Sequence, residues 1–338
     1  MVNYPDAIYK PRVLANKPGT EYAPEKTTRL FAEDQNGTNE EIVAVQEELG
    51  TNPKGAAGSV KERIEDIETL VPTAPFIKAS GEVYKDAEAK LINAIYSIIT
   101  PSNILALWIF DPITGTTITD RSIKNHDLII TPDISASVKG FNGLAPYVNL
   151  DEASDKYSTA DHTDFTFGDG SNDSAFSIMA LAKPANDAAY REIICKLNQT
   201  TGNEQVEWEF VKRDSNALQI RLFDNSVNKY IGRITAANAV TGAWQTLIAT
   251  YSGSKTAAGC KLFCNGVRAD TTDAISGGYV AMEKTTSEVA SVKKDTAGVA
   301  AYPYKGDISL IAICKEELTS TQIKRLDYLL KGYANLTL

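Results

Sequence analysis

Two glutamates that alternate along one predicted strand offer the most direct route to chemistry in this sequence. Glu207 and Glu209 are separated by one residue in VEWEF, so they point to the same side of a strand. Two carboxylates at that spacing approach the roughly 5–5.5 Å separation used by retaining glycosidases. Their neighbours Val206, Trp208 and Phe210 are apolar. We predict that these three fill a core while both glutamates face solvent, and we predict no catalytic residue.

A cluster of Asp and Asn residues in FGDGSND has the oxygen-rich chemistry of a calcium site. Asp169, Asn172 and Asp173 are the candidate ligands, because Ca²⁺ needs several oxygen donors. Other polar residues lie just before this loop or in a later turn: Asp161, His162, Asp164, Asp224 and Asn225. The same residue types, together with Gly, are the usual residues of tight turns. We favour structural turns, with bound Ca²⁺ as the alternative.

Exposed aromatic side chains are candidates for sugar binding, because a ring stacks on the apolar face of a pyranose. Trp108, Trp208 and Trp244 lie in apolar alternation and are expected in the core. The candidate carbohydrate-binding residues are therefore tyrosines: Tyr230, Tyr251, Tyr279 and Tyr302.

The cysteines and histidines indicate little metal or redox chemistry. Apolar runs surround Cys195, Cys260, Cys264 and Cys314, where Cys behaves as a small hydrophobe. Cys260 and Cys264 share the face of one predicted strand but are too far apart to form a disulfide. No C-x-x-C motif is present, and His126 and His162 fall in separate turns. We expect reduced core thiols and structural histidines, with a zinc site as the weaker alternative.

Charge and hydropathy exclude several classes of function. The net charge of −9 argues against a nucleic-acid binder, which needs clustered Lys and Arg. The N-terminal MVNYPDAIYKPRV has no apolar signal core, and no stretch reaches membrane-spanning length. We expect neither conventional secretion nor membrane insertion.

Period-two patterns dominate the chain after residue 104 and predict a mainly β fold. The expected strands are ALWIFDP, DLIITPD, AFSIMALAKP, REIICKLN, VEWEFVKR, ALQIRLFDN, KYIGRIT, WQTLIATYS, KLFCNG and DISLIAICKE. Turn residues separate these segments, which is typical of an antiparallel two-sheet β-sandwich or jelly roll. A helix capped by Thr319 or Ser320 is expected to close the domain, which we place at residues 104–338.

The first hundred residues have a different organisation. Residues 1–40 are rich in Pro, Lys, Thr and Glu and predict an extended anchoring arm. Residues 41–71 contain two short amphipathic stripes, which predict a helical hairpin or an oligomerisation module. Residues 72–103 form a connector whose segment 82–99 has helical spacing.

The C-terminal region resembles the laminin-G-like, concanavalin-A-like jelly-roll domains. The resemblance is carried by ALWIFDP followed by the turn Asp120-x-Ser122-x-x-x-His126, by FTFGDGSNDSAFSIMALAKP, by WQTLIATYSGSKTAAGCKLFCNG and by GDISLIAICKEELTSTQIKRL. Leu181-Ala182 stands where the family commonly has an aromatic residue. The resemblance implies the sandwich fold and, at one rim, a calcium site. These domains serve in lectins, adhesion proteins and virion proteins alike. The related glucanases carry a Glu-x-Asp-x-x-Glu strand, which this chain lacks.

The segment before the sandwich resembles a helical module of tailed-phage virion proteins. Leu49-Gly50-Thr51-Asn52-Pro53-Lys54-Gly55 and Val60-Lys61-Glu62-Arg63-Ile64 match its two phrases. The resemblance implies a tail-fibre, baseplate, head-fibre or decoration protein assembled in the host cytoplasm. Residues 1–71 would contact other virion proteins in a homo-oligomer, for which a trimer is one option.

These features together predict a non-enzymatic structural virion protein that displays a β-sandwich. The sandwich would bind host-surface glycan or decorate the particle. A free lectin-like adhesin is the alternative, and a glycoside hydrolase is a remote one.

Overall fold

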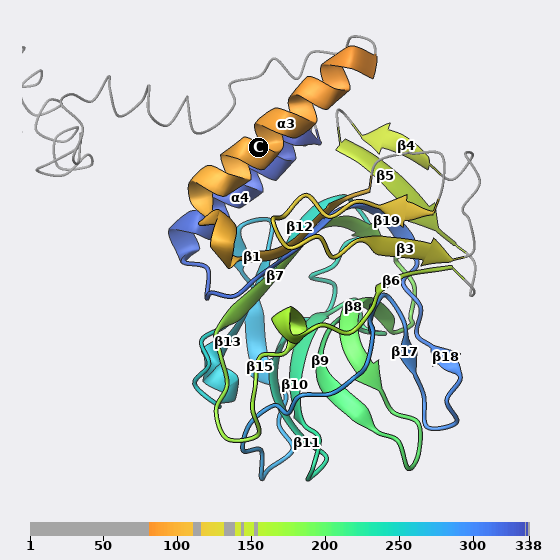
Figure 1. Ribbon diagram of the computed structural model, residues 1–338, viewed down its shortest axis with the longest axis vertical. Helices are drawn as coiled ribbons and strands as arrows, with labels where there is room; N and C mark the ends of the chain where they lie inside the picture. Colours follow the sequence, from red (N-terminus) through yellow and green to blue (C-terminus); the bar gives the residue numbers. More distant parts are fainter. Residues whose placement is uncertain are drawn as a thin grey trace, which may run out of the picture. The chain divides into compact units, whose positions relative to one another are not determined.

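A computed structural model describes residues 81–110, 116–131, 139–142, 145–151, 155–334 and 336 (Figure 1). The chain divides into two compact units, residues 1–70 and 71–338, and every described element belongs to the second. The arm predicted over 1–40 and the helical pair predicted over 41–71 lie outside the described residues.

The described elements are mainly strands, and the first and last of these elements are the two long helices. In chain order they are α3 (Gly81–Ile98), η1 (Pro101–Asn103), β1 (Ile104–Ile109), β2 (Thr117–Ile118), β3 (Leu128–Thr131), β4 (Lys139–Asn142), β5 (Ala145–Leu150), β6 (Lys156–Thr159), η3 (Thr163–Phe165), β7 (Phe176–Pro184), β8 (Arg191–Asn198), β9 (Gln205–Lys212), β10 (Leu218–Asp224), β11 (Lys229–Thr235), β12 (Gln245–Tyr251), η4 (Ala257–Gly259), β13 (Cys260–Cys264), β14 (Val267–Arg268), β15 (Asp270–Asp273), β16 (Val289–Ala290), β17 (Lys293–Lys294), β18 (Ala300–Ala301), β19 (Gly306–Cys314) and α4 (Ser320–Tyr333).

Two sheets form the sandwich, as the period-two pattern predicted. Sheet A has the order β14-β13-β12-β7-β19-β5-β4, with β1 beside β19. Sheet B has the order β15-β11-β10-β9-β8-β16-β6-β3-β2, and the hairpin β17–β18 attaches to β8. All ten predicted strands are present, as β1, β3, β7–β13 and β19. The antiparallel β-sandwich is therefore confirmed.

Strand β7 shows why sheet A has continuous apolar runs. Phe176, Ile178 and Ala180 face the core between the sheets. Met179 and Leu181 face a second core that also contains side chains of α3 and α4. Since successive residues of a strand point to opposite sides, a strand covered on both faces is apolar at most positions, as β7 is from Ile178 to Ala182.

The two helices cover the outer face of sheet A, where Figure 1 shows them side by side. In α3 the predicted stripe is buried at Ala87, Leu91, Ile95 and Ile98. This helix belongs to the segment predicted as a connector, and it packs in the same compact unit as the sandwich. Helix α4 begins at the predicted cap. The Thr319 hydroxyl accepts from the Gln322 backbone N–H, and the Gln322 side-chain oxygen accepts from the Thr319 backbone N–H.

The four cysteines are free thiols, as expected. Cys195, Cys260 and Cys314 are buried, while Cys264 is half-buried at the end of β13. Burial raises the pKa of Cys264 to about 11, so its reactive thiolate form is disfavoured near neutral pH. Among the described residues, no helix combines the length and the apolar character needed to cross a bilayer.

Candidate functional site

The outer face of sheet B buries the two glutamates that were predicted to face solvent. Glu207 and Glu209 have fully buried side chains, so that prediction is wrong. Trp208 and Phe210 do lie in the core between the sheets, whereas Val206 belongs to a separate small apolar cluster. The glutamates are buried because cationic side chains from β8, β10 and β17 contact them.

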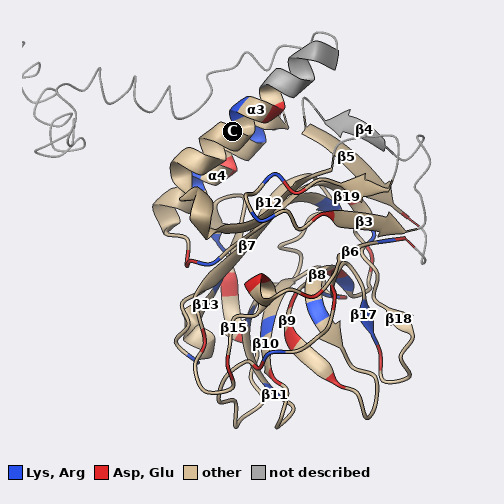
Figure 2. Cartoon of the chain, viewed as in Figure 1, with Lys and Arg blue, Asp and Glu red and all other residues tan. Residues whose placement is uncertain are grey.

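Lys293 of β17 joins two of the buried carboxylates. Its Nζ lies 3.3 Å from Oε1 of Glu192 on β8 and 3.5 Å from Oε2 of Glu209 on β9. Arg221 on β10 donates from Nε to Oε1 of Glu209 at 2.5 Å. We call Glu192, Glu209, Arg221 and Lys293 the charge network. Figure 2 shows red and blue segments close together on the neighbouring strands of sheet B.

The two carboxyl groups of the charge network have pKa values shifted in opposite directions. Burial and the neighbouring charge of Glu209 raise the pKa of Glu192 to about 8, so Glu192 is mainly neutral at pH 7. Burial would also raise the pKa of Glu209, but Arg221 and Lys293 outweigh that effect and hold it below its usual value. Opposite shifts in two adjacent carboxyls are a pattern shared by acid–base pairs and by buried ion networks.

A second buried ion pair fixes the loop before β16. Lys196 of β8 donates from Nζ to Oε1 of Glu207 at 2.5 Å, and its Nζ lies 2.9 Å from Oδ1 of Asp161. The same Glu207 oxygen accepts from the backbone N–H of Thr285 at 2.6 Å. Glu207 is therefore engaged in holding three segments together.

Two of the four predicted sugar-binding tyrosines lie beside the charge network. Tyr302 is 45% exposed, and Lys293 Nζ lies 4.8 Å from the centre of its ring. The ring of Tyr190 packs edge-on against Tyr302 at 5.7 Å. Tyr230 is half-buried, and the Arg221 guanidinium lies 5.1 Å from its ring centre. Each of these two tyrosines therefore lies beside a cation, Arg221 or Lys293, and both cations contact Glu209.

The other two predicted tyrosines tie a rim loop to the core. Both hydroxyls donate to Oδ2 of Asp173, from Tyr251 at 2.6 Å and from Tyr279 at 2.5 Å. Tyr251 is fully buried. Burial first, and then the hydrogen bond to Asp173, raise the pKa of both tyrosines. This geometry favours a structural role for the pair over stacking on a sugar.

Two of the candidate calcium ligands already accept hydrogen bonds, Asp169 within its own turn and Asp173 from distant parts of the chain. Oδ1 of Asp169 accepts from the backbone N–H groups of Ser171 and Asn172 at 2.8 and 2.6 Å. Oδ1 of Asp173 accepts from the backbone N–H of Met282 at 2.8 Å. A cation would compete with these donors, which favours the structural-turn interpretation. Comparing melting temperatures in Ca²⁺ and in EDTA would check it.

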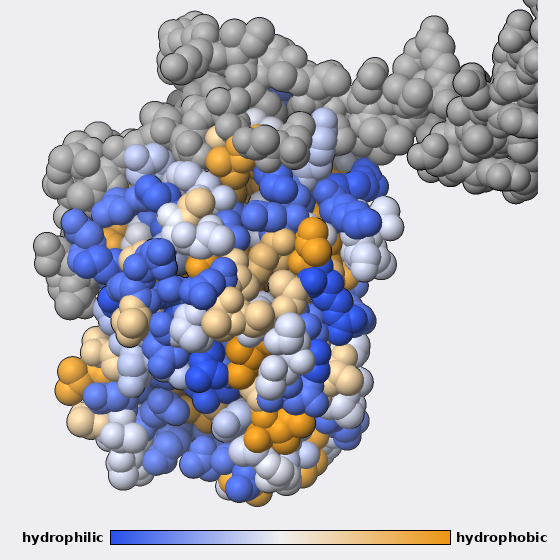
Figure 3. Space-filling model, turned by 180° about the vertical axis from the view of Figure 1, so that it is seen from behind, coloured by the Kyte–Doolittle hydropathy of each residue, from blue (hydrophilic) through white to orange (hydrophobic). Residues whose placement is uncertain are grey.

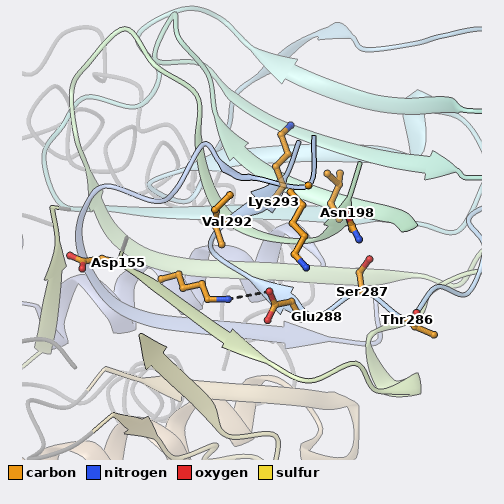
Figure 4. A pocket seen from close by; sticks show the side chains of 12 residues that line it. Asp155, Asn198, Thr286, Ser287, Glu288, Val292 and Lys293 are labelled. Carbon is orange, nitrogen blue, oxygen red and sulfur yellow. Dashed lines mark hydrogen bonds and ion pairs between the residues drawn. The ribbon is translucent and has the colours of Figure 1, made fainter. Parts of the chain in front are cut away.

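A cavity of about 550 Å³ adjoins the charge network (Figure 4). Its lining includes Asn198 at the end of β8, Ser287 and Glu288 before β16, and Lys293. Lys156 of β6 also lines it, and its Nζ lies 3.2 Å from Oε1 of Glu288. The volume is within the usual range for small-molecule sites, roughly 300–1,000 Å³. Amide, hydroxyl, carboxylate and ammonium groups together suit a ligand with many hydroxyls.

Sequence reasoning did not find this cavity. Its polar residues come from four separated segments, and none of them belongs to a recognisable motif. On the face seen from behind in Figure 3, the apolar side chains of the described residues appear as separate groups among hydrophilic ones.

Comparison with known proteins agrees with this architecture. A laminin G family model, described as concanavalin A-like lectin/glucanases superfamily, matches residues 152–324, which is just over half of the chain. The chain belongs to this superfamily. The matched region runs from β6 to β19. It therefore contains the charge network, the cavity and the four predicted tyrosines. The segment that resembles phage proteins precedes the match.

Solved structures show more distant likenesses to this superfamily member. The binding domain of Paraclostridial Mosquitocidal Protein 1 has 14% identity and a TM-score of 0.47, covering 67% of this chain and 52% of that one. The botulinum neurotoxin serotype D ligand binding domain, in complex with N-acetylneuraminic acid, has 15% identity, a TM-score of 0.45 and coverages of 69% and 52%. The Ruminococcus gnavus IT-sialidase CBM40, bound to alpha2,3 sialyllactose, has 16% identity, a TM-score of 0.38 and coverages of 47% and 84%. The chain thus spans about half the length of the first and second of these structures. No curated protein sequence matches it.

Proposed function

We propose that this protein binds carbohydrate on the outer face of sheet B and that it is not an enzyme. The observation that carries the proposal is the exposed ring of Tyr302 beside Lys293. Lys293 also lines the polar cavity. An exposed ring supplies a stacking surface for a sugar, and the cavity supplies hydrogen-bond donors and acceptors. Membership of a superfamily that includes lectins supports the same conclusion.

The charge network positions this site and does not act as its catalyst. A glycosidase needs one carboxyl to reach the glycosidic oxygen and a second to reach the sugar carbon or the water that attacks it. Glu192 and Glu209 are fully buried and are held by Lys293 and Arg221. Their role is to hold Lys293 beneath Tyr302.

Glycan-array binding of the full chain tests the proposal. Replacing Tyr302 by Ala should weaken binding to the recognised glycan by about tenfold or more, because about 1.4 kcal/mol of stacking and contact energy corresponds to one decade of affinity. Tyr328→Ala is the matched control, since Tyr328 is 42% exposed on α4, which covers the other sheet. Equal losses in the two variants, or no glycan bound by the native chain, would refute a site at Tyr302.

Hydrolysis is the remaining candidate activity, and the opposite pKa shifts of Glu192 and Glu209 are the observation that favours it. Incubating the full chain with a panel of polysaccharides should release no reducing ends. Release that disappears in Glu192→Gln and Glu209→Gln would show that the protein is a glycosidase.

We further propose that the sandwich is displayed on a tailed-phage particle. Support comes from the LGTNPKG and VKERI phrases in front of it. Residues 1–71 would anchor a homo-oligomer to other virion proteins, and the sandwich would meet host-surface glycan or decorate the shell. The protein should copurify with particles, and a chain lacking residues 1–71 should not. A free monomer that binds glycans without any particle would instead identify a lectin-like adhesin.

A further inference from the structure

The two histidines of the sequence meet at one rim of the sandwich. His126 lies in the turn before β3, and His162 is the cap residue of η3. Their ring centres are 4.4 Å apart, and the rings are inclined by 46°. They were expected as unrelated turn residues, so the fold creates a juxtaposition that the sequence order hides.

Asp164 joins both imidazoles through one carboxylate oxygen. Its Oδ2 lies 2.9 Å from Nε2 of His126 and 3.4 Å from Nδ1 of His162. The ligand atoms of the three side chains all lie within 4.8 Å of one another. Its other oxygen, Oδ1, lies 3.4 Å from Nζ of Lys124. The two oxygens of Asp164 therefore have different partners.

These separations suit a small divalent cation. Zinc binds imidazole nitrogen and carboxylate oxygen at about 2.0–2.2 Å, which places tetrahedral ligand atoms about 3.3–3.5 Å apart. The two distances from Asp164 to the imidazoles, 2.9 and 3.4 Å, lie close to this separation. Small rotations of the side chains would bring the three ligand atoms around one ion.

We propose that His126, His162 and Asp164 form a site for a zinc-class divalent cation. Imidazole nitrogens suit Zn²⁺, Co²⁺, Ni²⁺ and Cu²⁺, whereas Ca²⁺ and Mg²⁺ prefer oxygen ligands. Three protein ligands leave a fourth position for water or for a ligand group. The His162 side chain is 49% exposed, so this position opens to solvent.

The surrounding contacts hold His126 in place for such a role. Its backbone N–H donates to Oδ2 of Asp120 at 2.8 Å, and its carbonyl accepts from the Trp108 indole N–H at 2.6 Å. Its ring packs against Phe165 with centres 4.9 Å apart. Contacts of this kind orient metal-binding side chains before the metal arrives.

One hydrogen bond already occupies the imidazole of His162. Its Nδ1 accepts from the Asp164 backbone N–H at 3.1 Å. A metal would replace the backbone hydrogen bond at His162, which limits its affinity.

Lys124 makes the proposal sharply testable. Its ammonium group would repel a cation at Asp164. Removing that charge should tighten metal binding, whereas removing a ligand should weaken it. A set of hydrogen-bonded turn residues without a metal site would show neither effect.

The experiment is a titration of the full chain with CoCl₂, followed by visible absorption, and with ZnCl₂, followed by calorimetry. The native chain should bind one equivalent and show the intense absorption of four-coordinate Co²⁺. His162→Ala should weaken binding by about tenfold or more, and thermal unfolding should confirm that this half-exposed position leaves the fold intact. Lys124→Met should tighten binding several-fold. Lys315→Met is the matched control, since Lys315 is exposed beyond the end of β19.

Two results would overturn the site. One is absence of binding by the native chain at millimolar metal, or equal binding by His162→Ala. The other is equal affinity in Lys124→Met and Lys315→Met, which would contradict a cation at Asp164.

Discussion

The two sheets of the sandwich cover their outer faces in opposite ways. Sheet A is covered by α3 and α4, whose Leu and Ile side chains form an apolar layer with Met179, Leu181 and Leu310. Sheet B carries Glu192 and Glu209, which are fully buried, together with Lys293 and Arg221, whose side chains are 6% and 20% exposed. One face is closed by hydrophobic packing and the other by charge pairing.

The difference separates stability from recognition. An apolar layer gains free energy from nearly every contact and tolerates exchanges between apolar side chains of similar volume. A buried charge network contributes little net stability, yet losing one member leaves its partners unpaired. Sheet B therefore maintains an arrangement of charges that a simple core would not need, and the exposed Tyr302 lies above it. We expect the helices to stabilise the domain and the charged face to bind its ligand.

The largest effect should follow removal of the cation at the centre of sheet B. Lys293→Met leaves Glu192 and Glu209 buried without their shared partner and should lower the free energy of unfolding by about 3–5 kcal/mol. Urea unfolding would measure the loss. The double variant Lys293→Met/Glu209→Gln should recover part of it, because the buried carboxyl that otherwise keeps its charge is then neutral. A loss below about 1 kcal/mol would mean that the network is dispensable.

A cavity in the helical layer should have a slightly smaller effect. Leu326 of α4 is fully buried, so Leu326→Ala should cost about 2–4 kcal/mol. Glycan binding of the folded fraction should stay unchanged, because α4 covers the other sheet. Reduced affinity in this variant, measured well below its melting temperature, would show that the two faces are coupled.

The pH dependence of stability should also distinguish the faces. The pKa of Glu192 is raised from 4.5 to about 8 in the folded state. Folded Glu192 therefore holds its proton where the unfolded chain has lost it. Its contribution to stability is complete below about pH 4.5 and declines as the pH rises to about 8, by at most about 1.4 kcal/mol per pH unit. Urea unfolding of Glu192→Gln across this window should show a flatter profile than the native chain, whereas Leu326→Ala should keep the native slope.

The smallest effect concerns the start of α4. Thr319→Ala removes the hydroxyl of the capping box and should cost about 1 kcal/mol. Thr319→Ser keeps the hydroxyl and should recover most of this loss in a thermal melt. If the two substitutions cost the same, the cap contributes through its methyl group instead.

The sandwich was largely predictable because long strands and helices carry local patterns. The spacing of Leu91, Ile95 and Ile98 predicted α3, and Thr319, one of the two predicted caps, marked the start of α4. Short strands such as β14 and β16 have two residues each, too few to show a period. They exist because longer neighbours provide backbone partners.

The site was less predictable because the side chains that bury its glutamates lie far from those glutamates in the sequence. VEWEF alternates like a strand with one solvated face, and nothing local indicates that Lys293, 84 residues after Glu209, covers that face. His126 and Asp164 are likewise 38 residues apart. Residue types identified Tyr230 and Tyr302 as candidates, but the same rule selected the buried Tyr251.

Each of the three apolar clusters of the described residues contains one buried cysteine that could report on its opening. Cys314 lies in the helical layer, Cys260 in the central core and Cys195 in the small apolar cluster on sheet B. A thiol reagent reaches a buried cysteine only when the structure around it opens. In three variants that each keep one of these cysteines, labelling rates would reveal whether the helices detach before the sandwich opens, or whether all three layers unfold together.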